Sequence, residues 1–394
     1  MSSMRPASSG DDLDAVKVLD HLVRRAVSMG ASDIHIEPKR DSIRVRYRVD
    51  GVMVAQGQIP SELQPSLTSR VKVLARMDMT ERRLPQDGQF SIEVAGHALV
   101  HLRASTFPAI HGETLVLRVL LSQKLISIDK LGLSEADLPR VTKLADRPTG
   151  LVIVCGPTGS GKTSTLYSLL KVMNTAELSV VTLEDPIEVE FAEITQGQTN
   201  VRQGFTFAAG LRAILRQDPD VILVGEMRDP ETAQIALQAS LTGHLVLSTL
   251  HTSDAVETVS RLVDLGAESW IVANALLAVI GQRLVRLLCA ECAETYELEE
   301  DHVGEEEKLL IEAGTELKRA KGCAACHSTG YRGRAGIFEV LELDDDLRDL
   351  VKSRAGKRAY RDLSRRVGLV PLREAGIEKV KQGLTSLDEV LRVT

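Results

Sequence analysis

The sequence LVIVCGPTGSGKT, from Leu151 to Thr163, decides the fold of this 394-residue chain. Its first five residues are apolar, as in a buried strand, and Gly156–Thr163 matches the pattern G-x-x-x-x-G-K-[ST] in full. A helix is predicted directly after it, over residues 163–173. The backbone N–H groups of such a loop and the N-terminus of the following helix together bind phosphate groups. The stretch therefore predicts a nucleotide-binding α/β domain.

Short apolar runs alternate with helical stretches on the C-terminal side of this loop. The runs lie at residues 180–183, 221–224 and 245–249. They are apolar on both faces, which is typical of central parallel strands covered by helices. The sequence therefore predicts a doubly wound, RecA-like P-loop domain over residues 149–288.

A second domain, with a mixed α+β fold, is predicted before it over residues 13–122. Apolar residues at helical spacing predict helices over 14–29 and 61–77. Alternating segments predict strands at 42–49, 52–59, 89–94, 98–105 and 114–121. The fold class is thus α/β with an N-terminal α+β domain.

Smaller divisions complete the predicted organisation. Residues 1–12 are rich in serine and lack an apolar run, so we expect a flexible tail. Residues 123–148 are expected to be a linker with a short helix. Residues 289–335 are expected to form a small tetracysteine zinc element, and residues 336–394 a C-terminal helical region.

The composition excludes several classes of protein. The net charge is −7, and aromatic residues make up only 3% of the chain, so nucleic acid is not an expected partner. No apolar run reaches the roughly 18 residues that span a bilayer. The N-terminus lacks the apolar segment of a secretory signal. We therefore expect a cytoplasmic protein that reaches the membrane only through partners.

The glycine-rich loop offers a binding site for ATP and Mg²⁺. The expected nucleotide contacts are Gly156, Pro157, Thr158, Gly159, Ser160, Gly161, Lys162, Thr163 and Ser164. The ammonium group of Lys162 is expected to reach the β- and γ-phosphates, and the hydroxyl of Thr163 to hold Mg²⁺.

An ATPase also needs a carboxylate beside the phosphates, and two acidic groups follow predicted strands. Glu226 comes just after the strand 221–224, where it could meet Mg²⁺ or its water. Glu184 and Glu188 come after the strand 180–183. One of these acids is expected to polarise the attacking water, and the alternative is that one cluster merely caps a helix. His251 ends the strand 245–249 and could sense the γ-phosphate, or it could be structural.

Two cysteine pairs predict a structural zinc site. Cys289 and Cys292 form one C-x-x-C pair, and Cys323 and Cys326 form the other. Four thiolates complete a tetrahedral, closed zinc site, which is not catalytic. Two redox or inert pairs are the alternative. The acidic stretch 294–316 between the pairs is expected to be a strand-poor insert, either a solvated helix or a loop.

Arginines alternate along the predicted strand 42–49. Arg44, Arg46 and Arg48 therefore share one face of that strand. They could be charges on a solvated edge strand that block aggregation, or arginine fingers for a neighbouring subunit's ATP. Spacing alone favours the edge strand.

Several motifs, in order, resemble the secretion ATPase family of type II secretion and type IV pilus assembly. The resemblance runs from about Val16 to the C-terminus. The motifs are ASDIHIEP at 31–38, RYRVDG at 46–51, RLPQDG at 83–88, TLEDPIE at 182–188, ILVGEMRD at 222–229, TGH at 242–244 with His251 and Thr252, and the four cysteines.

The resemblance implies a PAS-like N-terminal domain and a ring-shaped homohexamer with ATP at subunit interfaces. The N-terminal domain then supplies Arg46, Arg48, Arg103 and Arg118 to the phosphates, and His251 contacts the γ-phosphate. Glu226 is implied near Mg²⁺, and the acids at 184–188 near the water. The implied work is pseudopilus or pilus assembly and protein export through an inner-membrane platform protein.

Some expectations stay open beside this resemblance. Compared with the larger members, the leading domain that docks the motor to its membrane partner is expected to be missing. The alternatives are a nucleic-acid-stimulated P-loop motor, a nucleotide-gated scaffold without hydrolysis, and a retraction motor. The last is less expected, because such motors generally lack the four cysteines.

Overall fold

The computed structural model describes residues 14–94, 99–120, 125–173, 175–298, 310–312 and 314–394. The tail predicted at 1–12 lies outside these residues. The chain divides into two compact units, Met1–Gln123 and Lys124–Thr394, which are described separately.

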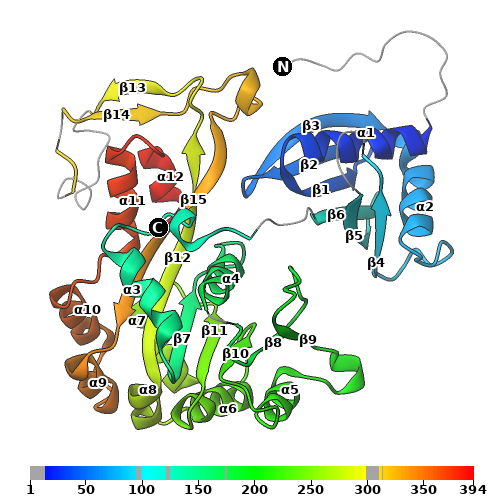
Figure 1. Cartoon of the computed structure of the whole chain (residues 1–394). Helices are drawn as coiled ribbons and strands as arrows, with labels where there is room; N and C mark the ends of the chain where they lie inside the picture. Colours follow the sequence, from blue (N-terminus) through cyan, green and yellow to red (C-terminus); the bar gives the residue numbers. More distant parts are fainter. Residues whose placement is uncertain (1–13, 95–98, 121–124, 174, 299–309, 313) are drawn as a thin grey trace. The chain divides into compact units, whose positions relative to one another are not determined.

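The N-terminal unit is an antiparallel sheet with two helices (Figure 1). The strand order is β3-β2-β1-β6-β5-β4, and every neighbouring pair is antiparallel. The elements are α1 (Ala15–Ser28), β1 (Ala31–Pro38), β2 (Ser42–Val49), β3 (Val52–Pro60), α2 (Gln64–Leu74), β4 (Gln86–Ile92), β5 (Val100–Ala109) and β6 (Gly112–Leu120). The predicted mixture of helices and strands is confirmed here, and β1 is the strand that the sequence analysis did not place.

One face of this sheet is apolar and the other is polar. In β1, Ile34 and Ile36 are buried in a cluster that includes Leu19 and Val23 of α1. Tyr47 of β2 joins the same cluster and donates a hydrogen bond from its hydroxyl to the carbonyl of Leu22, at 2.8 Å. Because side chains alternate along a strand, the residues between these positions lie on the opposite face.

The C-terminal unit is built on a seven-stranded sheet with the order β15-β12-β7-β11-β10-β8-β9. Its strands are β7 (Gly150–Cys155), β8 (Val180–Glu184), β9 (Thr195–Gln198), β10 (Val221–Val224), β11 (Leu245–Leu250), β12 (Leu276–Leu288) and β15 (Tyr331–Glu342). All neighbours are parallel except β12 and β15. This confirms the predicted parallel α/β core.

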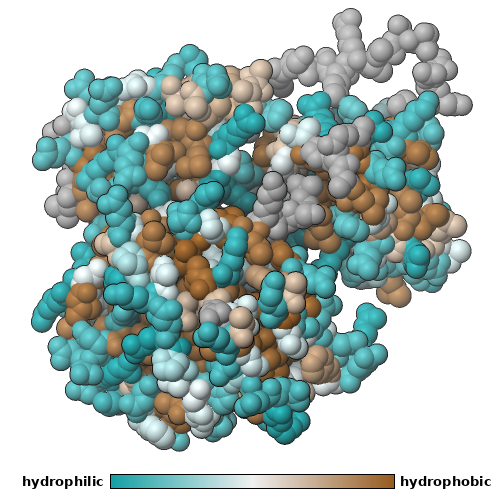
Figure 2. Space-filling view, in the orientation of Figure 1, coloured by the Kyte–Doolittle hydropathy of each residue, from teal (hydrophilic) through white to brown (hydrophobic). Residues whose placement is uncertain are grey.

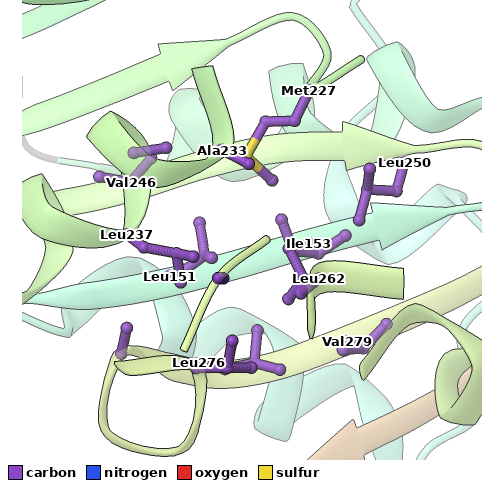
Figure 3. Close-up of a cluster of buried hydrophobic side chains, with 14 of the residues drawn as sticks. Leu151, Ile153, Met227, Ala233, Leu237, Val246, Leu250, Leu262, Leu276 and Val279 are labelled. Carbon is purple, nitrogen blue, oxygen red and sulfur yellow. The ribbon is translucent and has the colours of Figure 1, made fainter. Parts of the chain in front are cut away.

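Most helices of this unit cover the two faces of the central strands, and the last two pack against β12 and β15. They are α3 (Asp137–Lys143), α4 (Lys162–Val172), α5 (Phe207–Ile214), α6 (Pro230–Leu241), α7 (Ala255–Asp264), α8 (Ser269–Ala275), α9 (Asp345–Lys352), α10 (Lys357–Arg366), α11 (Leu372–Lys381) and α12 (Leu387–Val393). In β7, Leu151 and Ile153 pack into one core cluster, with α5 to α10, while Val152 and Val154 pack into the other, with α3 and α4. Figure 3 shows the first cluster, in which Leu151 and Ile153 lie among side chains of neighbouring strands and helices. Each such buried aliphatic side chain contributes about 1.5–3 kcal/mol.

Two sequence-based expectations for the region after β12 need correction. The stretch expected to be strand-poor begins with β13 (Glu294–Glu297), which pairs with β14 (Glu316–Arg319) in a separate antiparallel sheet. The strand β15 runs across the division placed at residues 335 and 336, and it pairs with β12 along almost its whole length. β12 and β15 are more than 40 residues apart in the chain, and antiparallel pairing at such a separation leaves no short-range signal. The sequence analysis therefore assigned neither β12 nor β15 as a strand.

On the face seen in Figure 2, hydrophilic side chains are interspersed with smaller hydrophobic areas. Among the helices of the described ranges, none has the length and apolar character that crossing a membrane requires.

Candidate active site

The phosphate-binding loop connects β7 to α4, as the sequence predicted. Gly156, Gly159 and Gly161 have φ angles of 146°, 80° and 90°, which residues with a side chain rarely adopt. Space is also restricted, because a Cβ atom at Gly156 would lie 2.5 Å from the carbonyl oxygen of Gln282. Glycine is therefore needed both for the turn of this loop and for its contact with β12.

Lys162 is buried at the start of α4. Its ammonium group donates hydrogen bonds to the carbonyls of Gly156 at 2.8 Å and Pro157 at 3.0 Å. Burial lowers the pKa of Lys162, while the negative charge of Glu226 acts in the opposite direction. Lys162 and Glu226 thus interact electrostatically beside the phosphate-binding loop.

The loop also holds a buried hydroxyl that suits a phosphate oxygen. The Oγ atom of Ser160 is buried and has no hydrogen-bond partner among the described residues. A buried hydroxyl normally has a partner, so this donor fits an anion bound in the loop. Thr163, half-buried in the first turn of α4, is in the position from which P-loop ATPases hold Mg²⁺.

Glu226 and His251 meet beside this loop. Glu226 follows β10 and His251 follows β11, and these parallel strands are neighbours, so their carboxyl ends lie together. The Nε2 atom of His251 is 3.3 Å from one carboxylate oxygen of Glu226. The other oxygen forms an ion pair with Arg228 at 2.7 Å. Ligands of parallel α/β sheets bind at this end of the strands.

Neither Glu226 nor Glu184 caps a described helix, so the helix-capping alternative does not apply to these two acids. In the stretch after β10, the side chain of Asp229, not that of Glu226, accepts the hydrogen bond from Thr232 N that caps α6. Glu184 ends β8 and caps none of the described helices. Its buried carboxylate instead accepts hydrogen bonds from the side chains of Tyr167, Thr182 and Gln196.

Two residues of β12 also contact the loop region, and the sequence analysis did not identify them. The hydroxyl of Thr165 donates to Gln282 Oε1 at 2.7 Å. Arg283 donates to the carbonyl of Ser253 at 2.6 Å, and its charge contributes to the lowered pKa of Lys162. β12 lies next to β7 in the sheet, and this pairing brings Gln282 and Arg283 to the loop.

The four arginines named from the resemblance lie on the polar face of the N-terminal sheet. Asp33 of β1 pairs with Arg48 of β2 and with Arg118 of β6, and Arg118 pairs with Arg103 of β5. Asp33 lies 3.0 Å from Arg118 Nε and 3.8 Å from Arg48 Nε. Arg48, Asp33, Arg118 and Arg103 therefore form one row across the four strands β2, β1, β6 and β5.

Two positions further along this face of β1, beyond His35, lies a second carboxylate. Glu37 of β1 binds both Arg44, at 2.5 Å, and Arg46. Their strand β2 lies between β3 and β1, so the expectation that these arginines lie on an edge strand is wrong. Its interior place follows from β1, the strand that the sequence analysis missed.

The four cysteines form a cluster with the dimensions of a zinc site. All four sulfur atoms lie within 4.8 Å of one another, and three of the separations between them are 3.8–3.9 Å. Tetrahedral zinc with bonds of about 2.3 Å places its sulfur ligands about 3.8 Å apart. The four thiols are free, and their proximity favours one shared metal site over two separate redox or inert pairs. Cys289 directly follows the end of β12, and Cys326 comes shortly before the start of β15. Figure 1 shows β13 and β14 at this end of the two long strands.

Backbone N–H groups favour the charged form of one of these thiols. Burial raises the pKa of Cys326, but hydrogen bonds from Cys323 N and Gly330 N outweigh burial and lower the pKa to about 6. A thiolate is the form that binds zinc. The residues present therefore fit a Zn²⁺ ion.

Comparisons with known proteins show the family to which the chain belongs. The family model described as "Type II/IV secretion system protein" matches residues 9–392. The chain is 47% identical over 390 residues to "Type II secretion system ATPase E" of Vibrio cholerae, covering 98% of this chain and 76% of that protein. The pilus retraction motor PilT with bound ADP is similar in structure, with a TM-score of 0.61 and 27% identity over 95% of this chain and 96% of that one. The ATPase DotB of Legionella pneumophila is similar in fold, with a TM-score of 0.71 at 21% identity, over 98% and 97% of the two chains. The chain belongs to the type II/IV secretion system protein family and is an ATPase of that family.

Proposed function

We propose that this ATPase is a homohexameric motor that converts ATP hydrolysis into mechanical work for pseudopilus or pilus assembly and protein export. One observation carries the proposal. The glycine-rich loop between β7 and α4 lies at the same sheet end as Glu226 and His251, which follow the neighbouring strands β10 and β11. A loop that binds phosphate and an acid beside it are what phosphoryl transfer to water requires.

The residues of the site have distinct roles in this proposal. Ser160 and the backbone N–H groups of the loop hold the phosphates, and Lys162 neutralises charge on the β- and γ-phosphates. Thr163 and Glu226 are the residues that would hold Mg²⁺, which supplies further neutralisation when bound. His251, half-exposed and in contact with Glu226, is placed to donate a hydrogen bond to an oxygen of the γ-phosphate.

The N-terminal unit has a role in trans in this proposal. Arg46, Arg48, Arg103 and Arg118 lie on one polar sheet face, where Asp33 and Glu37 hold several of them in place. In a ring, this face would meet the ATP of a neighbouring subunit and supply arginine fingers. Closure of the unit onto ATP and its release after hydrolysis would be the stroke.

The zinc element and the partners complete the proposal. Zn²⁺ held by the four cysteines would be structural, because all four ligand positions belong to the protein. The motor would act at the cytoplasmic face of the inner membrane, through a platform protein. The alternative of a nucleic-acid motor lacks support, since the relatives reported above are named as secretion or pilus ATPases.

A variant of the loop lysine tests the enzymatic part. Lys162→Ala should lower the steady-state rate of ATP hydrolysis by more than roughly 100-fold, because the variant loses a preorganised phosphate-neutralising charge. Lys171→Ala is the matched control, since Lys171 is exposed on the same helix. ATPase activity of Lys162→Ala equal to that of the control would contradict the proposed site.

The hexamer and the machine need separate measurements. Light scattering of the full chain with ATP and Mg²⁺ should give the mass of six subunits, and a monomer at micromolar protein would refute the ring. In cells that lack the gene, the natural chain should restore export or piliation. Glu226→Gln should not restore it, and restoration by this variant would refute coupling to hydrolysis.

A further inference from the structure

Tyr167 connects the phosphate-binding helix to the acidic segment after β8. It lies on α4, one turn after Thr163, and is 3% exposed. Its hydroxyl donates a hydrogen bond to Glu184 Oε2 and accepts one from the backbone N–H of Glu188, at 3.3 Å. One phenol oxygen therefore links α4 to both ends of the stretch from Glu184 to Glu188.

Both carboxylate oxygens of Glu184 accept hydrogen bonds from the protein. Its Oε1 atom accepts hydrogen bonds from Thr182 Oγ1 at 2.6 Å and Gln196 Nε2 at 3.1 Å, and Oε2 accepts the bond from Tyr167. The residue is 3% exposed. A general base must reach the proton of the attacking water, directly or through one water molecule. A buried carboxylate with three protein donors does not offer that access.

The same network holds the residues that follow. Gln196 of β9 donates to the carbonyl of Val189 at 3.1 Å and accepts from the backbone N–H of Phe191 at 2.8 Å. The ring of Phe191 meets the ring of Tyr167 edge to face, with centroids 5.2 Å apart. The segment 184–191 is thus tied to α4 on one side and to β9 on the other.

We propose that Tyr167 is a positioning residue for ATP hydrolysis, which acts with Glu184 to hold the segment 184–191 in register with the phosphate-binding helix. Neither side chain touches the reacting atoms. Because Tyr167 lies one helical turn from Thr163, any displacement of the first turn of α4 is passed to this segment through the phenol. Glu184 is accordingly part of the support, and Glu226 remains the acid beside the phosphates.

Removing the hydroxyl alone tests this role. Tyr167→Phe keeps the ring contact with Phe191 but breaks both hydrogen bonds. We expect kcat for ATP to fall roughly 10- to 30-fold, the effect of one buried hydrogen bond to a charged group. The KM for ATP and the affinity for ADP should change less than about two-fold, because the loop contacts remain. This division between kcat and KM distinguishes positioning from a general loss of folding.

Ser168→Ala is the matched control. Ser168 is the next residue of α4, is equally buried, and donates its hydroxyl to the carbonyls of Ile126 and Ser164 at 2.7 Å. It has no bond to the segment 184–191 in the structure described. This variant should keep kcat within about two-fold of the natural chain, and a loss as large as that of Tyr167→Phe would overturn the proposal.

A double variant tests whether the two side chains act as one unit. Glu184→Gln should lower kcat by a factor similar to that of Tyr167→Phe, and the double variant should be much less impaired than the product of the two effects. Full additivity would overturn the proposal. A second outcome would also overturn it: Glu184→Gln loses as much kcat as Glu226→Gln, while Tyr167→Phe keeps the kcat of the natural chain. Glu184 would then be a catalytic residue.

A variant on the β9 side tests the same network even if Tyr167→Phe fails to fold. Gln196→Leu removes the support from the β9 side while Tyr167 stays intact. It should reproduce the fall in kcat with an unchanged affinity for ADP, and natural kcat in this variant would refute the shared network.

Discussion

Replacement of Glu389 by glutamine should destabilise the C-terminal unit by an amount that the structure sets. The side chain of Glu389 on α12 is 0% exposed. It accepts hydrogen bonds from Arg286 N at 3.0 Å, Arg286 Nη2 at 2.8 Å, Arg392 Nε at 2.8 Å and Arg392 Nη2 at 2.6 Å. Arg286 lies on β12 and stacks over the ring of Tyr331, so this carboxylate attaches the last helix to the sheet.

The magnitude follows from the pKa of Glu389. Burial alone would raise this pKa, but the hydrogen bonds from Arg392 and Arg286 outweigh burial and lower it to about 2 from 4.5. The difference corresponds to roughly 3 kcal/mol at 1.36 kcal/mol per pH unit. Arg392 is half-exposed, so solvent screens part of the interaction, and we expect Glu389→Gln to lose about 2 kcal/mol at pH 7.

The pH dependence has a definite sign. Since the folded-state pKa lies below the unfolded one, the stabilisation is complete above pH 4.5 and is lost as the pH falls toward 2. The difference between the natural chain and Glu389→Gln should therefore stay constant from pH 7 to pH 5 and shrink below pH 4.5.

Urea unfolding followed by tryptophan fluorescence measures this difference. Trp270 is the single tryptophan of the sequence and lies on α8 of the same unit. Glu378→Gln is the matched control, because Glu378 is 60% exposed in its pair with Lys381 and should contribute less than about 0.5 kcal/mol. Equal stability of the natural chain and Glu389→Gln at pH 7, or a difference that grows with acidity, would refute the reasoning.

Two further predictions concern metal and pH. Removal of zinc by a chelator, or Cys323→Ser, should lower the melting temperature of the C-terminal unit, because the four thiolates would lose the ion that joins the ends of β12 and β15. Elemental analysis should find one zinc per chain. A zinc-free chain with an unchanged melting temperature would contradict this prediction. Burial raises the pKa of Glu339 on β15 from 4.5 to about 7, so the folded state binds more protons than the unfolded state between these pH values. The free energy of unfolding should therefore fall by up to about 3 kcal/mol as the pH rises from 4.5 to 7. Glu339→Gln should remove this fall in urea titrations at pH 5 and pH 8, and parallel curves for both proteins would count against it.

The sequence by itself determined the features that depend on residues adjacent in the chain. The loop Gly156–Thr163 and the helix after it follow from adjacent residues, because glycines and a helix N-terminus are enough to specify a phosphate-binding turn. The strands β7, β10 and β11 follow from short runs that are apolar on both faces. The paired C-x-x-C motifs indicated a cysteine cluster, and the four sulfur atoms do meet.

Only the tertiary structure decided which of these features come together. Gln282 and Arg283 reach the loop because β12 pairs with β7 across more than 120 residues of chain. Glu184 and Glu226 look alike in sequence, since both follow an apolar strand. They differ in the fold, because Tyr167 and Gln196 surround one while His251 and Arg228 bind the other. Strand order sets such contacts, and local patterns of apolar residues do not encode it.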